Sequence, residues 1–468
     1  MRAVIAFSLA FALVAASPQA QTAKSPARSV APVRIVCGVD EPRIATRASA
    51  IADAAWKETC SLFDLEAVSG VGPYEIHLDA NVTDYNAACD KLLRGKFKKN
   101  LAVTIWNPLS VHVVLQPTVH GDALHTLAPT VQTLRLVAHE VAHLARCVAL
   151  PTYRDQPGWL KDGAATWIAS KVLAAQGLSK EPEQSPFSST NVVRVQRLLR
   201  DARLPSVDDL LHDRTGALEF YERYAVRWLL FRYLVEGERA RAFRAFLVDL
   251  RSIGGGDGCV DRCDDLLKER LAVDEWSRFD DGFRRWIAAL KPEWDQGFVS
   301  LEPAGDEWTQ SSFDDADAVA FRTAPAGSRP YAIEGSVATL IDRNDQPQAN
   351  LLLGRLALSD GHERFVRVAL VPGSGATVYD YDSSRAADSQ WMRLARVASN
   401  DSAAGRPLAF AVTCTPKANA TELELKLAGK VVATCTVERV LDGPWGVGAQ
   451  AGSSCVWRGV KLVPAGAR

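Results

Sequence analysis

The chain has 468 residues and a mass of 50.8 kDa, a length that at roughly 150 residues per domain predicts two or three domains. Hydrophobic residues make up 47% and charged residues 23%, which excludes a disordered, collagen-like or polytopic membrane protein. Lys and Arg total 54 against 55 for Asp and Glu. This balance lacks the basic footprint of a nucleic-acid-binding protein and gives no general attraction to anionic membranes, so we expect no nucleic-acid partner.

The N-terminal residues predict export. Arg2 supplies a positive charge, the apolar stretch 3–16 follows it, and small residues near positions 16 and 20 offer cleavage sites. The stretch is shorter than the about 20 residues that a membrane-spanning helix needs. We therefore expect residues 1–20 to be a signal peptide and the mature protein to be periplasmic or secreted, without stable membrane insertion. An uncleaved anchor is the alternative.

The chain has nine cysteines, and in an exported protein cysteines form disulfide bonds more often than they bind metal. Cys259 and Cys263 flank a short Asp-containing segment and suggest a bridge across a short loop. Further bridges are expected within two groups, the N-terminal Cys37, Cys60, Cys89 and Cys147 and the C-terminal Cys414, Cys435 and Cys455. The first group allows three pairings, and the second leaves one thiol over. The sequence has no Cys-x-x-Cys pair, so a cysteine-bound zinc site is not expected.

Apolar periodicity predicts a mixed α+β region over residues 33–292. A spacing of three to four residues between apolar side chains favours helices, and strict alternation favours strands. The expected helices are 45–62, 130–147, 159–175, 219–236, 239–251 and 275–290, and the expected strands are 74–78, 101–106 and 111–115. The second half of this region is therefore mostly helical.

The pattern changes near Pro292, where short alternating runs begin, separated by clusters of Gly, Pro, Asn and Asp. These runs are 318–322, 332–341, 364–370, 408–414, 422–427 and 430–437. Regularly spaced short strands with turn signals predict an all-β, antiparallel sandwich. We expect a linker within 291–306 and separate domains over 33–292 and 298–468.

A short motif carries the chemistry. Residues 139–143 read His-Glu-Val-Ala-His and fall within a predicted buried helix. Positions i and i+4 lie one above the other on a helix, so His139 and His143 can bind one metal ion. Glu140 projects from the adjacent edge, where it can hold a water beside the metal. The alternative is that both histidines are satisfied by hydrogen bonds in the core.

A catalytic zinc needs a third protein ligand and leaves its fourth position to water. Eighteen residues separate His143 from Asp162, which stands at the start of the second predicted helix. The small residues 163–165 permit that helix to pack close to the first. We therefore expect Asp162 to complete a zinc site. The alternative role of Asp162 is to stabilise the start of its helix through the macrodipole.

The histidine motif, followed by Trp159-Leu160-Lys161-Asp162-Gly163-Ala164-Ala165, resembles the gluzincins, the thermolysin-like zinc metallopeptidases also called peptidase MA-like. The resemblance covers about residues 33–290. It implies a zincin-like α+β catalytic domain in which His139, His143 and Asp162 bind Zn²⁺ and Glu140 is the general base. It also implies that the substrate is a peptide or protein.

Two further features of this resemblance concern single residues. Tyr224 best matches the helix aromatic residue that faces the developing oxyanion in related enzymes, and Tyr221 is the second choice. Either tyrosine could instead pack its helix against the core. The family pattern has Glu where this chain has Asp162, which is shorter by about 1.5 Å of reach. Aspartate is a legitimate zinc ligand, but its helix has to lie closer.

The C-terminal sequence carries a second resemblance. Residues 443–452 and 455–462, with Asn350-Leu351-Leu352-Leu353-Gly354 upstream, resemble the strands of concanavalin-like or laminin-G-like jelly rolls. This resemblance implies an accessory domain that binds a glycan or cell-surface ligand. A purely structural accessory domain is the alternative.

These features predict an exported, zinc-dependent metallopeptidase with a C-terminal jelly-roll domain. The alternative is a binding protein in which a zincin fold has lost turnover and the lectin-like module binds carbohydrate or protein. A third interpretation is a scaffold with a structural zinc, but such a site needs a fourth protein ligand that the sequence does not nominate.

Overall fold

The computed structural model describes most of the chain beyond the N-terminal residues. The described residues are 33–39, 42–65, 73–97, 101–106, 109–115, 131–150, 152–179, 186–296, 301–304, 307–311, 318–341, 348–358, 362–371, 374–398, 406–451 and 453–465. The expected signal peptide, residues 1–20, lies outside them. Among the helices of the described residues, none combines the length and apolar character that crossing a membrane requires.

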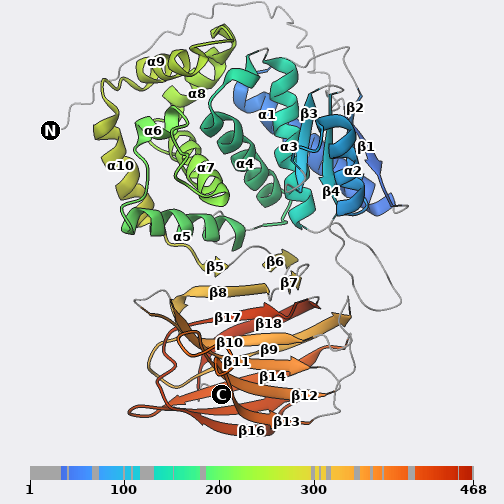
Figure 1. Cartoon of the computed structure of the whole chain (residues 1–468), viewed down its shortest axis with the longest axis vertical. Coiled ribbons are helices and arrows are strands. Elements are labelled where there is room, and N and C mark those ends of the chain that lie inside the picture. Colours follow the sequence, from blue (N-terminus) through green and yellow to red (C-terminus); the bar gives the residue numbers. More distant parts are fainter. Residues whose placement is uncertain are drawn as a thin grey trace, which may run out of the picture. The chain divides into compact units, whose positions relative to one another are not determined.

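The N-terminal part contains a four-stranded sheet in the order β1-β2-β4-β3 (Figure 1). Its strands are β1 (Val33–Cys37), β2 (Tyr74–Asp79), β4 (Leu109–Val114) and β3 (Ala102–Trp106). The first three run parallel, and β3 pairs antiparallel with β4 at the end of the sheet. This antiparallel end strand is important for the site because it lies beside α3.

Helices cover both faces of this sheet. Ile76 and Val111 point from one face into a core shared with α1 (Pro42–Phe63) and α3 (Val131–Ala149). Val103 on the opposite face packs with α2 (Val82–Leu93). Because side chains alternate along a strand, the sheet presents one apolar surface to each layer of helices.

Helices dominate the remainder of this part, as the sequence predicts. They are α4 (Gly158–Ala175), α5 (Pro186–Arg200), α6 (Val207–Leu211), α7 (Phe220–Glu236), α8 (Ala240–Asp249), α9 (Cys259–Leu271) and α10 (Trp276–Ala289). α4 packs between α3 and α7. The sequence analysis missed β1, α2, α5, α6 and α9. In α9, four buried residues at i, i+4, i+8 and i+12 form a stripe too narrow to stand out among its charges.

Two antiparallel sheets make up the C-terminal part. The first has the order β13-β12-β11-β10-β17-β8-β5 and the second β16-β15-β14-β9-β18-β7-β6. The strands are β5 (Trp294–Gln296), β6 (Leu301–Ala304), β7 (Glu307–Ser311), β8 (Ala318–Pro325), β9 (Tyr331–Ile341), β10 (Ala349–Ala357), β11 (Glu363–Val371), β12 (Gly375–Asp382), β13 (Trp391–Val397), β14 (Leu408–Pro416), β15 (Thr421–Leu427), β16 (Lys430–Val437), β17 (Pro444–Ala449) and β18 (Ser453–Pro464). Leu351 and Val366 of one sheet share a core with Val412 and Leu425 of the other. This part is therefore a β-sandwich, and the chain combines an α+β region with an all-β one.

The strands begin earlier than the sequence analysis expected. β5 lies inside the segment 291–306 that we interpreted as a linker, and it pairs with β8. Trp294 is 3% exposed and belongs to the core of the sandwich. A single buried tryptophan is enough to fix this short strand, and three residues are too few for an alternating pattern to be recognised.

The expected disulfide bonds are wrong. No disulfide bond joins any of the nine cysteines, all of which lie within the described residues. Cys259 and Cys263, which we expected on either side of a turn, stand one turn apart on α9 and are both buried. The helix continues through the Asp-containing segment between them, so no loop is present for a bridge to close.

Candidate metal centre

The two motif histidines converge on one point. His139 and His143 lie one turn apart on α3, and their Nε2 atoms are 2.9 Å apart. The helix forms because the apolar side chains of Leu134, Val137 and Val141 recur at helical spacing, and all three are fully buried. This buried stripe fixes which face of α3 the histidines occupy.

Asp162 joins the histidines from a second helix. It is the fifth residue of α4, and its Oδ1 lies 3.8 Å from Nε2 of His143. Single ligand atoms of His139, His143 and Asp162 all lie within 4.8 Å of one another, the one such His, Cys, Asp or Glu cluster found among the described residues. The structure therefore brings together the three side chains that the sequence analysis nominated.

A hydroxyl group lies beside the Nδ1 atom of each imidazole ring. The Nδ1 of His143 is hydrogen-bonded to the Tyr153 hydroxyl, and the Nδ1 of His139 lies 3.4 Å from Oγ1 of Thr166. When Nδ1 carries the proton in each ring, both Nε2 atoms present lone pairs toward Asp162. That tautomer is the one that binds a metal through Nε2.

Burial keeps the imidazoles neutral. It lowers the pKa of His139 to about 3 and holds the pKa of His143 well below its ordinary value, with a smaller contribution from His139. A neutral imidazole is the form that ligates metal. Burial also raises the pKa of Asp162, and the neighbouring Arg227 opposes that rise.

Glu140 lies beside the cluster on the same helix, 8% exposed. Its Oε2 accepts a 2.6 Å hydrogen bond from Oγ1 of Thr104 on β3. Burial raises the pKa of Glu140 to about 7; the Thr104 hydrogen bond lowers it, and the charge of Asp162 adds to the rise. A carboxylate with a pKa near neutrality is suited to accept and return a proton.

Of the two candidate tyrosines, Tyr224 is the one near the cluster. Its ring centre lies 6.2 Å from that of His139. Burial raises its pKa well above the ordinary value, and the charges of Asp162 and Glu140 add to the rise. Tyr221 is 43% exposed, and both tyrosine rings contact Phe220. Tyr224 therefore stays a proton donor at neutral pH.

A buried arginine connects the two ligand-bearing helices. Arg146 on α3 is fully buried and donates to the carbonyl oxygens of Leu160 at 2.9 Å and Lys161 at 3.3 Å. These carbonyls directly precede Asp162 in α4. The guanidinium also lies 4.8 Å from the ring centre of Tyr153, which holds His143.

The sequence analysis missed several residues around the cluster. Thr166 and Arg227 carried a usable signal, because they lie one turn after Asp162 and Tyr224 on their helices. No sequence pattern pointed to Thr104 or Tyr153, since a polar residue in a strand or loop has many roles.

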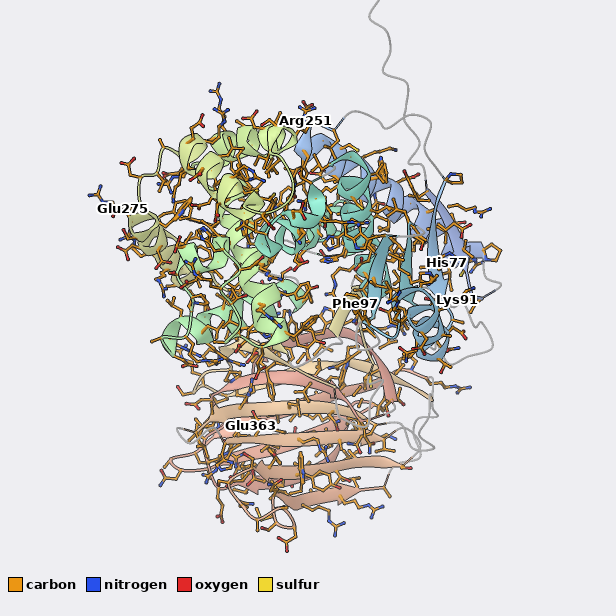
Figure 2. The ribbon with its side chains drawn as sticks, turned by 45° about the horizontal axis from the view of Figure 1, so that its top comes forward. His77, Lys91, Phe97, Arg251, Glu275 and Glu363 are labelled. Carbon is orange, nitrogen blue, oxygen red and sulfur yellow. The ribbon has the colours of Figure 1, made fainter. Side chains whose placement is uncertain are left out.

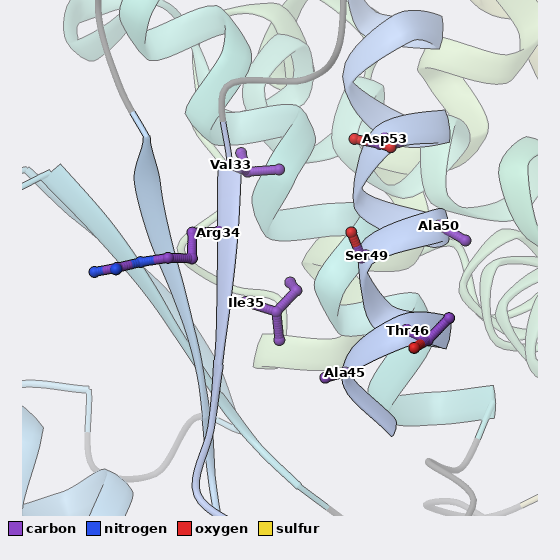
Figure 3. A pocket seen from close by; sticks show the side chains of 8 residues that line it. All are labelled: Val33, Arg34, Ile35, Ala45, Thr46, Ser49, Ala50 and Asp53. Carbon is purple, nitrogen blue, oxygen red and sulfur yellow. The ribbon is translucent and has the colours of Figure 1, made fainter. Parts of the chain in front are cut away.

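The other histidines among the described residues do not join the cluster. His77 lies on β2 (Figure 2). It stacks against His112 of β4 at 4.4 Å between ring centres. His120 and His125, which precede α3 in the sequence, lie outside the described residues. An open pocket of about 620 Å³ lies between β1 and α1, and Arg34, Ser49 and Asp53 are among the residues that line it (Figure 3). None of the nominated site residues lines that pocket.

The cluster fits a divalent cation. In a tetrahedral site with ligands at about 2.0–2.1 Å, neighbouring ligand atoms lie about 3.3 Å apart. The separations of 2.9 Å between the histidine nitrogens and 3.8 Å between His143 and Asp162 bracket this value. Two neutral imidazoles and one carboxylate are also one of the donor sets found in catalytic zinc sites.

Comparisons with known proteins give structural matches alone. No family model and no curated protein matches the chain. One similar solved structure is the carbohydrate-binding module CBM66 from Bacillus subtilis, 10% identical, covering 36% of this chain and 94% of that one at a TM-score of 0.29. Another is the metal-free carbohydrate recognition domain of Emp46p, 14% identical, covering 36% and 87% at a TM-score of 0.30. A third is a legume lectin-like domain from Entamoeba histolytica, 8% identical, covering 37% and 91% at a TM-score of 0.27. Likenesses at these TM-scores carry no argument about function.

Proposed function

We propose that this protein is an exported, zinc-dependent peptidase of the gluzincin type. The observation that carries the proposal is the convergence of His139, His143 and Asp162, with the carboxylate of Glu140 beside them. The motif spacing and the gluzincin resemblance of the sequence point to the same four residues. A random pair of helix histidines has no chemical need of a carboxylate from a second helix or of an adjacent buried glutamate.

The residues divide the chemistry among them. His139, His143 and Asp162 would hold zinc, which when bound lowers the pKa of water and polarises a scissile carbonyl. Glu140 takes a proton from the attacking water and delivers it to the leaving amine. Tyr224 donates a hydrogen bond to the oxyanion that develops on the carbonyl oxygen. Thr104 holds the Glu140 carboxylate in place throughout.

Metal content and turnover, measured together, test this proposal. The purified protein is expected to contain about one zinc per chain, as a site with three protein ligands requires, and to cleave members of a peptide library. Asp162→Ala is expected to lose most of the zinc. Glu140→Gln is expected to keep the zinc and lose hydrolysis, because the amide cannot accept the proton.

The outcomes separate the proposal from its alternatives. Full turnover by Glu140→Gln would overturn the role of the base. Zinc binding without any turnover by the wild type would favour the binding protein that has lost catalysis. Failure of the wild type to bind zinc, even with excess metal, would overturn the peptidase altogether.

We propose further that the sandwich is an accessory module for a glycan ligand. Trp391 on β13 is 38% exposed, and its ring centre lies 4.3 Å from that of Tyr381 and 6.1 Å from that of Tyr379. The guanidinium of Arg367 lies 3.9 Å over the same tryptophan. A partly exposed aromatic ring beside a guanidinium offers stacking and hydrogen bonding to sugar rings.

A glycan array with the full chain tests the accessory role. Binding that is saturable in the wild type and lost in Trp391→Ala supports the module. Met392→Ala is the matched control, because Met392 is the next residue on the strand, is 46% exposed and belongs to the opposite face. A blank array, or binding that survives Trp391→Ala, would favour a structural role. Export is tested separately by sequencing the N terminus of the protein recovered outside the cytoplasm.

A further inference from the structure

An arginine from α7 holds Asp162. Oδ2 of the aspartate accepts a 2.5 Å hydrogen bond from Nη1 of Arg227, while Oδ1 lies 3.8 Å from Nε2 of His143. The two carboxylate oxygens are therefore divided between Arg227 and His143. The side chains of Asp162 and Arg227 are each 17% exposed, so water competes little for this ion pair.

A second carboxylate fixes Arg227. Its Nη2 donates to Oδ1 of Asp213 at 3.0 Å, and Oδ2 of Asp213 accepts from the backbone N–H of Gly158 at 2.6 Å. Gly158 is the first residue of α4, and the preceding Pro157 supplies no side-chain cap. Asp213 therefore satisfies a first-turn N–H of the helix that carries Asp162 and orients the arginine at the same time.

Tight packing around Arg227 confines this arrangement. A Cβ at Gly158 would lie 2.4 Å from Cζ of Arg227, and a Cβ at Gly163 would lie 2.5 Å from its carbonyl oxygen. Two glycines of α4 on either side of Asp162 therefore contact Arg227. Gly158 lies against its side chain, and Gly163 lies against its backbone. The missing side chain at Gly158 leaves the space that the guanidinium occupies beside the carboxylate.

We propose that Arg227 is a positioning residue that presents Asp162 to the metal through a single oxygen, with Asp213 holding Arg227 in turn. This inference rests on the proposed metal site and deepens it. A carboxylate with one oxygen bound to a guanidinium has lost its freedom to rotate before the metal arrives, so ligation costs less conformational entropy. The arginine thereby lets the shorter aspartate serve as the third ligand.

Zinc affinity of the full-length protein tests the proposal, measured by competition with a chromophoric chelator at constant pH. Arg227→Met is expected to raise the zinc dissociation constant about 10- to 100-fold, the usual effect of removing a partner of a metal ligand. The zinc dissociation constant of Arg227→Lys is expected to lie between those of Arg227→Met and the wild type. The lysine keeps the positive charge, but its single ammonium group cannot bind Asp162 and Asp213 as the two guanidinium nitrogens do. Arg244→Met, an exposed arginine on α8, is the control and should bind zinc like the wild type.

The visible spectrum of the Co²⁺-loaded protein supplies a second readout that a purely structural role would not change. Arg227→Met should alter the absorption bands of the bound ion, since the orientation of one ligand changes. A dissociation constant within about twofold of the wild type and an unchanged spectrum would overturn the inference while leaving the peptidase intact. Failure of the wild type itself to bind zinc would instead overturn the proposed function.

If Arg227→Met does not fold, as judged by circular dichroism, Arg227→Lys and Asp213→Asn carry the test. Weaker zinc binding in both, with the melting temperature of the zinc-free protein unchanged, supports the positioning role. Wild-type affinity in both overturns it.

Discussion

Thr104 donates a 2.6 Å hydrogen bond to the carboxylate of Glu140, which joins the end strand of the sheet to the helix of the candidate metal centre. The two residues are 36 positions apart in the chain. This hydroxyl comes from the sheet face that packs on α3. The sheet therefore contributes to the orientation of the proposed base.

The first prediction concerns this bond. Thr104→Val keeps the shape of the side chain and removes the hydroxyl. We expect kcat for peptide hydrolysis to fall about 10- to 100-fold, equivalent to the roughly 1.5–3 kcal/mol of a hydrogen bond to a charged group. Zinc content should not change. Thr104→Ser is the control that retains the hydroxyl, and equal kcat values for Val and Ser at this position would contradict the prediction.

The second prediction concerns the partner of His143. Tyr153→Phe removes the hydroxyl that is bonded to Nδ1 of His143. We expect zinc affinity to fall about 10-fold or more, because the ring loses the contact that fixes its tautomer. Tyr85→Phe is the control, since it removes a buried hydroxyl that bonds to the carbonyl of Phe97 on the other face of the sheet. Equal zinc affinities in the two variants would count against a role for Tyr153.

A third prediction separates the two tyrosines of α7. Tyr224→Phe should lower kcat about 100-fold or more and leave zinc binding unchanged, as expected for the loss of one donor to an oxyanion. Tyr221→Phe should retain activity, because Tyr221 lies against Phe220 at the exposed end of the helix. If Tyr221→Phe lost activity and Tyr224→Phe kept it, Tyr221 would be the hydrogen-bond donor to the oxyanion.

A fourth prediction concerns the packing of α4 on α7. Gly163→Ala places a Cβ 2.5 Å from the carbonyl oxygen of Arg227 and 2.9 Å from Cβ of Phe231. We expect a loss of about 1–3 kcal/mol in the free energy of unfolding, measured with denaturant, because a well-packed contact cannot absorb the added methyl group. Gly216→Ala is the control, since a Cβ there meets nothing within 4 Å. If the denaturation midpoint of Gly163→Ala equalled that of the wild type, α4 and α7 would be able to move apart without loss of stability, and the prediction would be wrong.

A fifth prediction concerns pH and the sandwich. Burial alone would raise the pKa of Asp382, but hydrogen bonds from Ser384 and the ion pair with Arg364 lower it to about 2. An unfolded aspartate has a pKa of about 3.9, so the folded state favours the ionised form. The resulting stability is fully present above about pH 4 and is lost as the pH falls toward about 2.

Melting temperatures of the wild type and Asp382→Asn check this sign. The amide does not ionise, so the variant should melt lower than the wild type at neutral pH, and the gap should close below about pH 4. A gap that is constant over this range would show that the carboxylate charge contributes nothing.

The sequence predicted the local geometry of the candidate site. The spacing of His139 and His143 and the apolar stripe of Leu134, Val137 and Val141 both depend on the 3.6-residue period of one helix. The alternating runs of residues 318–437 predicted a sandwich for the same kind of reason, since strand periodicity is also local. Very short or sparsely apolar elements such as β5 and α9 were not predicted, because they contain too few repeats of the apolar spacing.

Cysteine pairing could not be predicted from composition and compartment. A bridge depends on whether two Cβ atoms come to face each other at about 3.5–4.5 Å, which is a property of the packed fold. In this structure Cys259 and Cys263 stand on one continuous helix, and no disulfide joins any of the nine cysteines.

Two imidazoles and a glutamate share one helix, and the sequence predicts this because the relation spans a single helical turn. Whether Asp162 reaches them depends on the tertiary packing of α4 against α3, where Arg146 binds the carbonyl oxygens of Leu160 and Lys161. The tertiary structure also decided the partners of each group. Arg227 and Asp162 are 65 residues apart in the chain, and contacts between such distant residues are set by packing rather than by any period in the sequence.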